Sequence, residues 1–184
     1  VGHHGYFGRR SRSAFLTNGE EEYLKKFQHG KEFHVAKADF QNTHTIDKPM
    51  EEKYHISWQP ADGNPGIIYL TPVFYMNEQE NPFKLEKRQY PVDFGSAFER
   101  TFMLTLTIPD NYVIDDVPES KIIGLPQNTG RYIYNVNITG NTINIASMLS
   151  INRSLFAQTE YEGLREFYSM VVSKQAEQIV LKKK

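Results

Sequence analysis

The stretch RYIYNVNITGNTINIASMLS, residues 131–150, decides the fold because it predicts an antiparallel hairpin. Apolar residues alternate with polar ones on both sides of Gly140 and Asn141, and a two-residue loop that begins with glycine fits a type II′ turn. Pairing the residues that flank this loop places the apolar side chains of both strands on one face, and a slip by one residue would separate them. The predicted register is Thr139 with Thr142, Ile138 with Ile143, Val136 with Ile145, and Tyr132 with Leu149.

Other segments repeat the same period of two. The aromatic share is 13%, and aromatic residues favour half-buried pleated surfaces. A strand with apolar residues on one side needs a core on that side. The segments with this pattern are 98–108, which ends at Pro109, 33–35 and 54–58, and the compact apolar run 67–70 between Gly66 and Pro72 also indicates a strand.

Two segments have helical spacing instead. The first, residues 18–30, begins with an asparagine cap, has a carboxylate three residues later and ends at a glycine. In the second, Thr159 and Glu162 predict a capping box before an apolar stripe. The last residues, 178–184, are either a final edge strand or a frayed terminus. We therefore expect a mostly β (α+β) fold, an antiparallel two-layer β-sandwich with one short helix in the N-terminal half and one C-terminal helix.

The length of 184 residues suits one domain or two small ones. We expect one β-rich unit, 1–184. The polar segment 76–89 crosses a proline and is the candidate internal boundary. It would separate an N-terminal half, 1–75, from a C-terminal sandwich domain, 90–184.

Composition excludes several classes of partner and site. The formal net charge of -1 gives no field that would gather nucleic acid or an anionic membrane surface. Cysteine is absent, which removes disulfides, thiolate metal sites and cysteine nucleophiles. No apolar run reaches the length of about 18 residues that a spanning helix needs, so we expect no membrane span. The chain begins at Val1 without a signal peptide, and we expect a processed product or an excised fragment.

The triplet Asp93-Phe94-Gly95 matches the sequence that holds magnesium in protein kinases. A kinase also needs an HRD-type catalytic loop and a glycine-rich nucleotide loop, and the chain has neither. We interpret the triplet as a corner between strands, where Pro91 fixes the entry and the glycine permits a sharp bend. Its aspartate would cap the turn or pair with Arg88 or Arg100.

The histidines do not have the spacing of metal ligands. His3 and His4 are adjacent and would point to opposite faces of a strand, while His34, His44 and His55 stand apart without a carboxylate at HExxH spacing. No GxSxG elbow is present, and nothing favours a carboxylate pair for sugar hydrolysis. The sequence therefore predicts no catalytic residue, no metal and no cofactor.

Two further patterns have a binding interpretation and a structural one. The basic run 9–12 is short, and we interpret it as a solvated strand or loop rather than a phosphate site. Trp58, Phe74 and Tyr75 are candidates for an aromatic platform that binds glycan, although such residues at period two are more often part of a half-buried sheet.

Recognisable motifs lie in residues 80–112 and 164–184. They are Asn81-Pro82-Phe83, Leu85, Arg88, Tyr90-Pro91-Val92-Asp93-Phe94-Gly95, Glu99, a TLTIP-type strand, Lys174-Gln175 and 177–181. Together they resemble the C-terminal region of bacterial transglutaminase-like proteins, which ends in a domain family of unknown function. The resemblance covers 80–184 well and the first 75 residues more weakly.

In that family a papain-like core with a Cys, His and Asp constellation precedes this region, and the proteins are usually exported to the bacterial envelope. Because this chain has no Cys, the resemblance implies a non-catalytic accessory unit that packs on or positions a transglutaminase-like core of the same polypeptide, in the periplasm or cell envelope. The residues it implies as a structural signature are Arg88, Tyr90, Pro91, Asp93, Phe94, Gly95 and Glu99.

Two alternatives stay open. The first is a β-sandwich module that binds a glycan or an extended peptide, through an aromatic platform or a free sheet edge. The second is an enzyme in its own right, which we rank last because no constellation of residues supports it.

Overall fold

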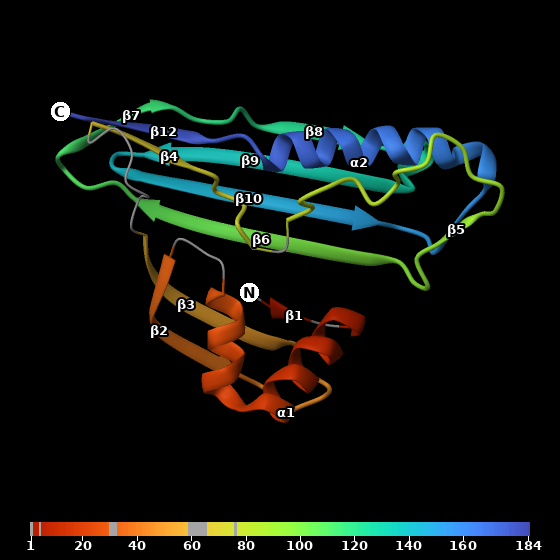
Figure 1. Ribbon diagram of the computed structural model, residues 1–184, viewed down its shortest axis with the longest axis horizontal. Helices are drawn as coiled ribbons and strands as arrows, with labels where there is room; N and C mark the ends of the chain where they lie inside the picture. The colour runs from red at the N-terminus through yellow and green to blue at the C-terminus, as the bar shows by residue number, and fades with distance from the viewer. Residues whose placement is uncertain (1, 4, 30–32, 59–65, 76) are drawn as a thin grey trace. The chain divides into compact units, whose positions relative to one another are not determined.

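The computed structural model describes residues 2–3, 5–29, 33–58, 66–75 and 77–184 (Figure 1). The chain forms two compact units, Val1–Gly63 and Asn64–Lys184. We call them unit 1 and unit 2. The polar segment 76–89, where the sequence suggested an internal boundary, lies inside unit 2.

Two polar groups of the segment 77–89 form hydrogen bonds to the C-terminal helix. The Glu78 N–H donates to Oε1 of Gln175 at 2.7 Å. The Asn81 side chain donates to the carbonyl of Arg165 at 2.8 Å. Polar residues that read as a linker in sequence therefore fix this segment to the fold.

Unit 1 consists of a broken helix and a small antiparallel sheet. The helix α1, Gly5–Gln28, is interrupted at Gly19, whose φ of 79° and ψ of 166° are not helical. The helix we predicted over 18–30 corresponds to the part of α1 after this break, whereas the part before the break was not predicted; Gly30 lies outside the described residues. The strands are β1 (Gly2–His3), β2 (Phe33–Gln41) and β3 (Met50–Trp58), in the sheet order β1-β3-β2.

The core of unit 1 contains a buried carboxylate among aromatic rings. Glu52 is fully buried and accepts hydrogen bonds from the hydroxyls of Tyr23 at 2.8 Å and Tyr54 at 2.6 Å. The Phe27 and Tyr54 rings stack at 4.3 Å. These contacts join α1 to β3, so the hydroxyl donors make burial of the carboxylate tolerable.

Unit 2 is built from antiparallel sheets, and the mostly β fold with two helices is confirmed. The larger sheet has the order β6-β10-β9-β8, a second has β4-β12-β7, and β11 pairs with β5. The final strand β12 is central in its sheet, so neither alternative for residues 178–184, an edge strand or a frayed terminus, was right. The elements are β4 (Ile67–Leu70), β5 (Val92–Asp93), β6 (Phe98–Thr107), β7 (Tyr112–Asp116), β8 (Lys121–Gly124), β9 (Gly130–Thr139), β10 (Thr142–Ile151), β11 (Leu155–Phe156), α2 (Tyr161–Gln175) and β12 (Ile179–Lys183), with 3-10 turns at Pro126–Asn128 and Gln158–Glu160.

The register of the β9–β10 hairpin is the predicted one. Thr139 pairs with Thr142, and the three apolar pairs follow in the expected order. Gly140 has a φ of 56°, which suits the first position of a type II′ turn. Ile143 and Ile145 are buried on the inner face of the sheet.

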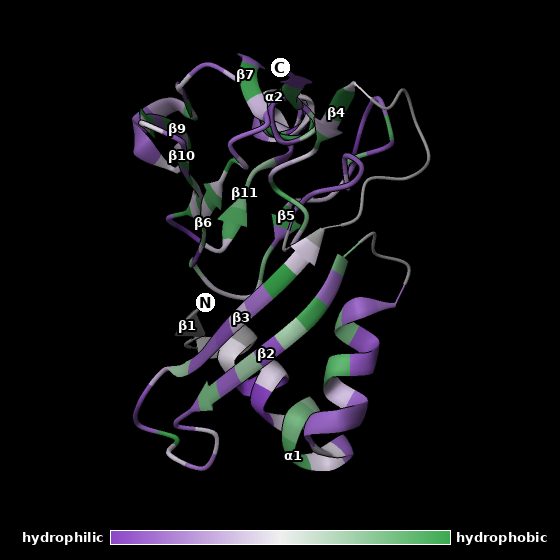
Figure 2. Cartoon of the chain, turned by 90° about the vertical axis from the view of Figure 1, so that its left-hand side faces the viewer, coloured by the Kyte–Doolittle hydropathy of each residue, from purple (hydrophilic) through white to green (hydrophobic). Residues whose placement is uncertain are grey.

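Helix α2 covers that inner face. Figure 2 shows the strands β9, β10 and β6 at one side of unit 2, with α2 and β4 on the other side of the sheet. The helix buries Leu164, Phe167 and Val171. No described element of unit 2 covers the opposite face of the larger sheet.

The capping box that we predicted for α2, with Thr159 and Glu162, is wrong. The helix has Glu160 as its N-cap, and no side chain caps it. The Glu160 carboxylate instead accepts the Ala157 N–H at 2.8 Å and pairs with Arg153. A preceding 3-10 turn shifts the start of the helix, so Thr159 and Glu162 do not take the cap positions.

Candidate functional site

The corner at residues 90–95 uses its polar groups internally. The Asp93 Oδ1 accepts the Gly95 N–H at 2.8 Å, and the Phe94 N–H donates to the Ser154 carbonyl at 2.8 Å. Gly95 has a φ of 76°, a conformation that glycine adopts without strain. The aspartate therefore stabilises a turn, because an Asp side chain can accept a hydrogen bond from the backbone N–H two residues later.

Aromatic rings anchor this corner to the core. The Phe94 ring lies 5.6 Å from Phe156, 6.2 Å from Phe83 and 5.8 Å from Phe98. It also stacks with Tyr168 of α2 at 6.4 Å. The corner therefore joins β5, β6, β11 and α2 through one side chain.

The candidate ion-pair partners of Asp93 and the other signature residues have different surroundings. Arg100 forms its ion pair with Glu78 rather than with Asp93. Arg88 is half-buried, and Tyr90, Pro91 and Glu99 are exposed. The signature residues therefore all belong to unit 2, and they differ in burial.

The candidate aromatic platform is divided between the two units. Trp58 ends β3 in unit 1, and its side chain lies outside the described residues. Phe74 and Tyr75 belong to unit 2 and are half-buried, and the Phe74 ring packs edge-on against Phe102 at 5.4 Å. Phe74 therefore contributes to the sheet core.

The part of the chain that the structure describes contains no group of three or more His, Cys, Asp or Glu side chains that could hold a metal ion. His34, His44 and His55 are exposed and separate. The side chains of His3 and His4 lie outside the described residues.

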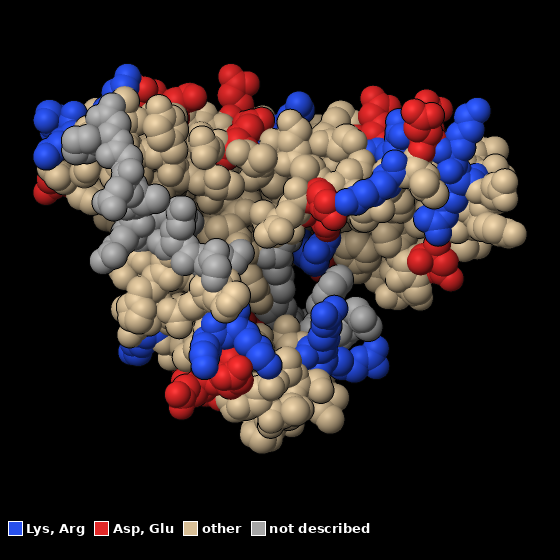
Figure 3. Space-filling view, in the orientation of Figure 1, with Lys and Arg blue, Asp and Glu red and all other residues tan. Residues whose placement is uncertain are grey.

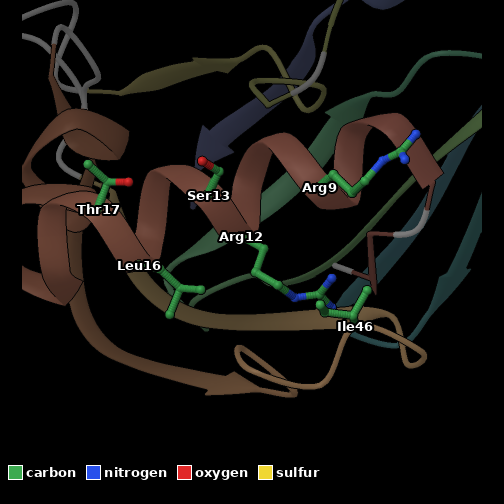
Figure 4. Close-up of a pocket in the computed structure, with 6 residues that line it drawn as sticks. All are labelled: Arg9, Arg12, Ser13, Leu16, Thr17 and Ile46. Atoms are coloured by element: carbon green, nitrogen blue, oxygen red, sulfur yellow. The ribbon is translucent and has the colours of Figure 1, made fainter.

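The basic run 9–12 is helical and not a solvated strand or loop. Arg12 is 7% exposed, and its guanidinium donates to the carbonyls of Asn42, Thr45 and Lys48 at 3.3, 3.1 and 2.8 Å. Its several donors hold the loop between β2 and β3. An open pocket of about 330 Å³ adjoins it, where Figure 4 shows the Arg12 side chain pointing from α1 towards Ile46. The pocket is lined by Arg9, Arg12, Ser13, Leu16, Thr17 and Ile46.

A polar pocket of about 610 Å³ lies beside the end of α2. Lys174 lines it, although this residue is only 4% exposed, and its Nζ lies 2.5 Å from the Glu177 carboxylate and 5.1 Å from the centre of the Tyr134 ring. In the sequence Lys174 was recognised only as part of a motif, and its burial was not predicted. The available signal was its place three residues after Val171, inside the apolar stripe of the helix.

The inner face of the larger sheet carries two buried tyrosines with different partners. Tyr132 and Ser147 share a hydrogen bond of 2.9 Å between their hydroxyls. The hydroxyl of Tyr134 has no hydrogen-bond partner among the described residues. Burial raises the pKa of both phenols, and burial also raises the pKa of Tyr168.

The outer face of the larger sheet carries an apolar patch. Strand register places Thr101, Met148, Ile133 and Ile122 in one row across all four strands, and Met103 and Ala146 in the next row. Met103 is 70% exposed and Ile122 is 62% exposed. We call the set Met103, Ile122, Ile133, Ala146 and Met148 the outer-sheet patch.

The visible face carries charged residues of both signs. Figure 3 shows basic and acidic side chains interspersed on the visible face. None of the described helices combines the length and apolar character needed to cross a membrane.

Comparisons with known proteins identify a family and a related fold. The family described as "Domain of Unknown Function with solved-structure structure (DUF3858)" matches residues 66–181. The comparison with curated proteins gives no match. Among solved structures, the chain is similar to the crystal structure of a "putative protease" from Parabacteroides distasonis, with a TM-score of 0.52 and 15% sequence identity, covering 65% of this chain and 24% of that one. The chain thus spans about a quarter of that protein's length, and the likeness shows the fold alone.

Proposed function

Because this chain belongs to the DUF3858 family through residues 66–181, we propose that it is a non-catalytic accessory domain of a longer bacterial protein. In this proposal it packs on or positions a transglutaminase-like core of the same polypeptide. The motifs Asn81-Pro82-Phe83 and 90–95 carry the resemblance to that class. The proposal assigns the chemistry to the core and a structural role to this chain.

The observation that carries the proposal is that Asp93, Phe94 and Asn81, which belong to the recognised motifs, are engaged by the fold itself. The Asp93 carboxylate accepts a hydrogen bond from its own turn, and Phe94 packs against rings from β11 and α2. The Asn81 side chain accepts the Phe83 N–H at 2.8 Å and donates to the Arg165 carbonyl. Residues that catalyse a reaction leave polar atoms facing a substrate, whereas these polar atoms are engaged by the fold.

The absence of Cys from the chain supports the same division of roles. A papain-like nucleophile is a thiolate, so it has to come from another part of the protein. The Parabacteroides protein with a similar fold is about four times as long as the matched region, which is consistent with such a fold serving as one part of a larger chain.

The resemblance also supports a place in the periplasm or cell envelope. Export of the gene product can be measured by cell fractionation, with its presence in the cytoplasmic fraction alone as the contrary result.

A second candidate function is binding of an extended peptide by strand addition. The observation that favours it is the position of β6 at the edge of its sheet. Between Thr101 and Thr107, no described strand pairs with the edge of β6 that faces away from β10. Exposed edges of this kind can accept a peptide through main-chain hydrogen bonds. A screen of extended peptides against the chain, with calorimetric measurement of the affinities, tests this function directly.

The accessory role is tested by recombining the two parts of the protein. The region encoded upstream of Val1 is produced separately, and its binding to chain 1–184 is measured by calorimetry together with the thermal stability of the upstream region. We expect saturable one-to-one binding and a higher melting temperature, because a partner that binds only the folded state stabilises it. An upstream region without a Cys, His and Asp core, or one that is indifferent to chain 1–184, would contradict the proposal.

A further inference from the structure

We propose that the outer-sheet patch is the surface on which a neighbouring domain of the same polypeptide packs. The inference rests on the proposed accessory function and adds the surface that serves it. The patch lies on the face of the larger sheet opposite α2, and among residues 66–75 and 77–184 no element covers that face (Figure 2).

The first argument is the chemistry of the outward-facing positions. Along β6, β8, β9 and β10 these positions hold threonine, asparagine, serine and the apolar patch, and Glu99 and Arg131 are their only charged residues. Both charged residues flank Ser150, in one row at the end of the sheet. A surface that faces water usually mixes charges throughout, whereas the centre of an interface is depleted in them.

The second argument is the continuity of the apolar residues. Met148 lies beside Ile133, and Ile133 lies beside Ile122, on three adjacent strands. Met103 lies beside Ala146 in the neighbouring row. Side chains directly opposite one another on adjacent strands are in contact range, so these residues form one surface rather than scattered exposures. Methionine adapts its shape to a partner surface.

The third argument is area, which selects the kind of partner. Strands β6, β9 and β10 are each 10 residues long. With a rise of about 3.4 Å per residue and a strand spacing of about 4.8 Å, the face of the four strands measures about 500 Å². Contact with a matching surface would bury about 1,000 Å² in total, which suits domains of one chain and falls below the usual size for separate stable partners.

A second copy of the chain is therefore the less suitable occupant. A free partner must offset the loss of translational and rotational freedom, whereas a tethered domain has already lost most of it. The observed structure of the patch thus fits a partner supplied by the same polypeptide.

Methionine oxidation tests this inference, because methionines lie both inside and outside the patch. Met103 is 70% exposed, Met170 of α2 is 37% exposed, and Met50 is fully buried. Dilute peroxide is added to chain 1–184 and to the longer gene product, and sulfoxide formation is followed by peptide mass spectrometry. We expect oxidation of Met103 to slow by about tenfold in the longer protein, while the rate at Met170 changes by less than about twofold.

Matched substitutions give a second readout. Met103→Glu places a charge in the patch, and Met170→Glu makes the same change elsewhere on unit 2. We expect Met103→Glu to weaken binding of the separately produced upstream region by about tenfold or more, and Met170→Glu to change it by less than about twofold. Circular dichroism of both variants establishes that the fold is retained.

The outcomes separate the failure of this inference from that of the proposed function. Binding of the upstream region with protection of Met170 and not Met103 would overturn the patch assignment and leave the accessory role in place. Absence of any binding would overturn both. A dimer of chain 1–184 in light scattering that Met103→Glu abolishes would replace the neighbouring domain with a second copy and so overturn the inference.

Discussion

The two tyrosines on the inner face of β9 provide a matched test of the core. Tyr132 and Tyr134 are two residues apart on one strand, and their side chains are 0% and 1% exposed. The Tyr132 hydroxyl bonds to Ser147 at 2.9 Å, while the Tyr134 hydroxyl has no hydrogen-bond partner among the described residues. Substitution by phenylalanine removes the hydroxyl oxygen at either position. At Tyr132 that hydroxyl has a hydrogen-bond partner, and at Tyr134 it has none among the described residues.

Tyr132→Phe breaks a buried hydrogen bond and leaves the Ser147 hydroxyl without this partner. Because a buried group that loses its partner keeps its desolvation cost, we expect the free energy of unfolding to fall by about 1 to 3 kcal/mol. Tyr134→Phe removes a hydroxyl that is buried without compensation, so the free energy of unfolding should rise by about 1 kcal/mol. The two variants should therefore differ by about 2 to 4 kcal/mol.

Urea denaturation followed by far-ultraviolet circular dichroism measures both values at neutral pH, with the slope compared to ensure that the unfolded states are equivalent. Equal destabilisation of the two variants would mean that Tyr134 has a partner, and the hydrogen-bond assignment of this face would be refuted.

Four further predictions concern pH, the corner and the hairpin. Burial raises the folded-state pKa of Tyr132, Tyr134 and Tyr168 above the ordinary value of 10.0. The neutral phenols therefore contribute fully to the free energy of unfolding below about pH 10. Above that pH the free energy of unfolding should fall by up to about 1.4 kcal/mol per pH unit for each tyrosine, because the unfolded state loses its phenol protons first. A flat alkaline profile would contradict this. Gly95→Ala should lower the free energy of unfolding by about 1 to 2 kcal/mol, because a Cβ at this position would meet no atom and only the positive φ opposes the substitution. Gly95→Asn should lower it less, because asparagine adopts a positive φ more readily. Asp93→Asn should lower the free energy of unfolding by about 0.5 to 3 kcal/mol. Magnesium, calcium or a chelator should affect the melting temperature of this variant and of the parent chain equally. A rise in melting temperature with metal that is seen in the parent and lost in the variant would revive a metal role for Asp93. Ile143→Asp should destabilise by about 4 kcal/mol or more because Ile143 is fully buried, and a change within about 0.5 kcal/mol would refute the face assignment.

Local patterns were sufficient for the β9–β10 hairpin. Gly140 with Asn141 defines the loop, and alternation of apolar residues then permits one register, so the pairing follows from residues close in sequence. The same reasoning explains why β6 was predicted, since its alternation ends at Pro109.

Elements that depend on distant contacts were not predicted correctly. Strand β12 is central because β4 and β7 approach it from both sides, which its own short sequence does not indicate. The first part of α1 contains Gly5 and Gly8 and lacks a clear apolar period. Burial of Arg12 depends on carbonyls more than 25 residues away in the loop before β3.

The candidate sites show the same division. The corner at 93–95 could be interpreted from glycine and aspartate chemistry alone. The outer-sheet patch could not, because it is assembled from side chains on four strands whose order is set by the whole fold.

The central claim, that this chain is a non-catalytic part of a longer enzyme-like protein, is tested most directly by measuring turnover. Chain 1–184 and the longer gene product are assayed in parallel for amine transfer to glutamine side chains and for peptide-bond hydrolysis. We predict turnover by the longer product that is lost when its upstream nucleophilic cysteine is replaced, and none above the blank for chain 1–184. Turnover by chain 1–184 that persists at constant specific activity through repeated purification would contradict the account.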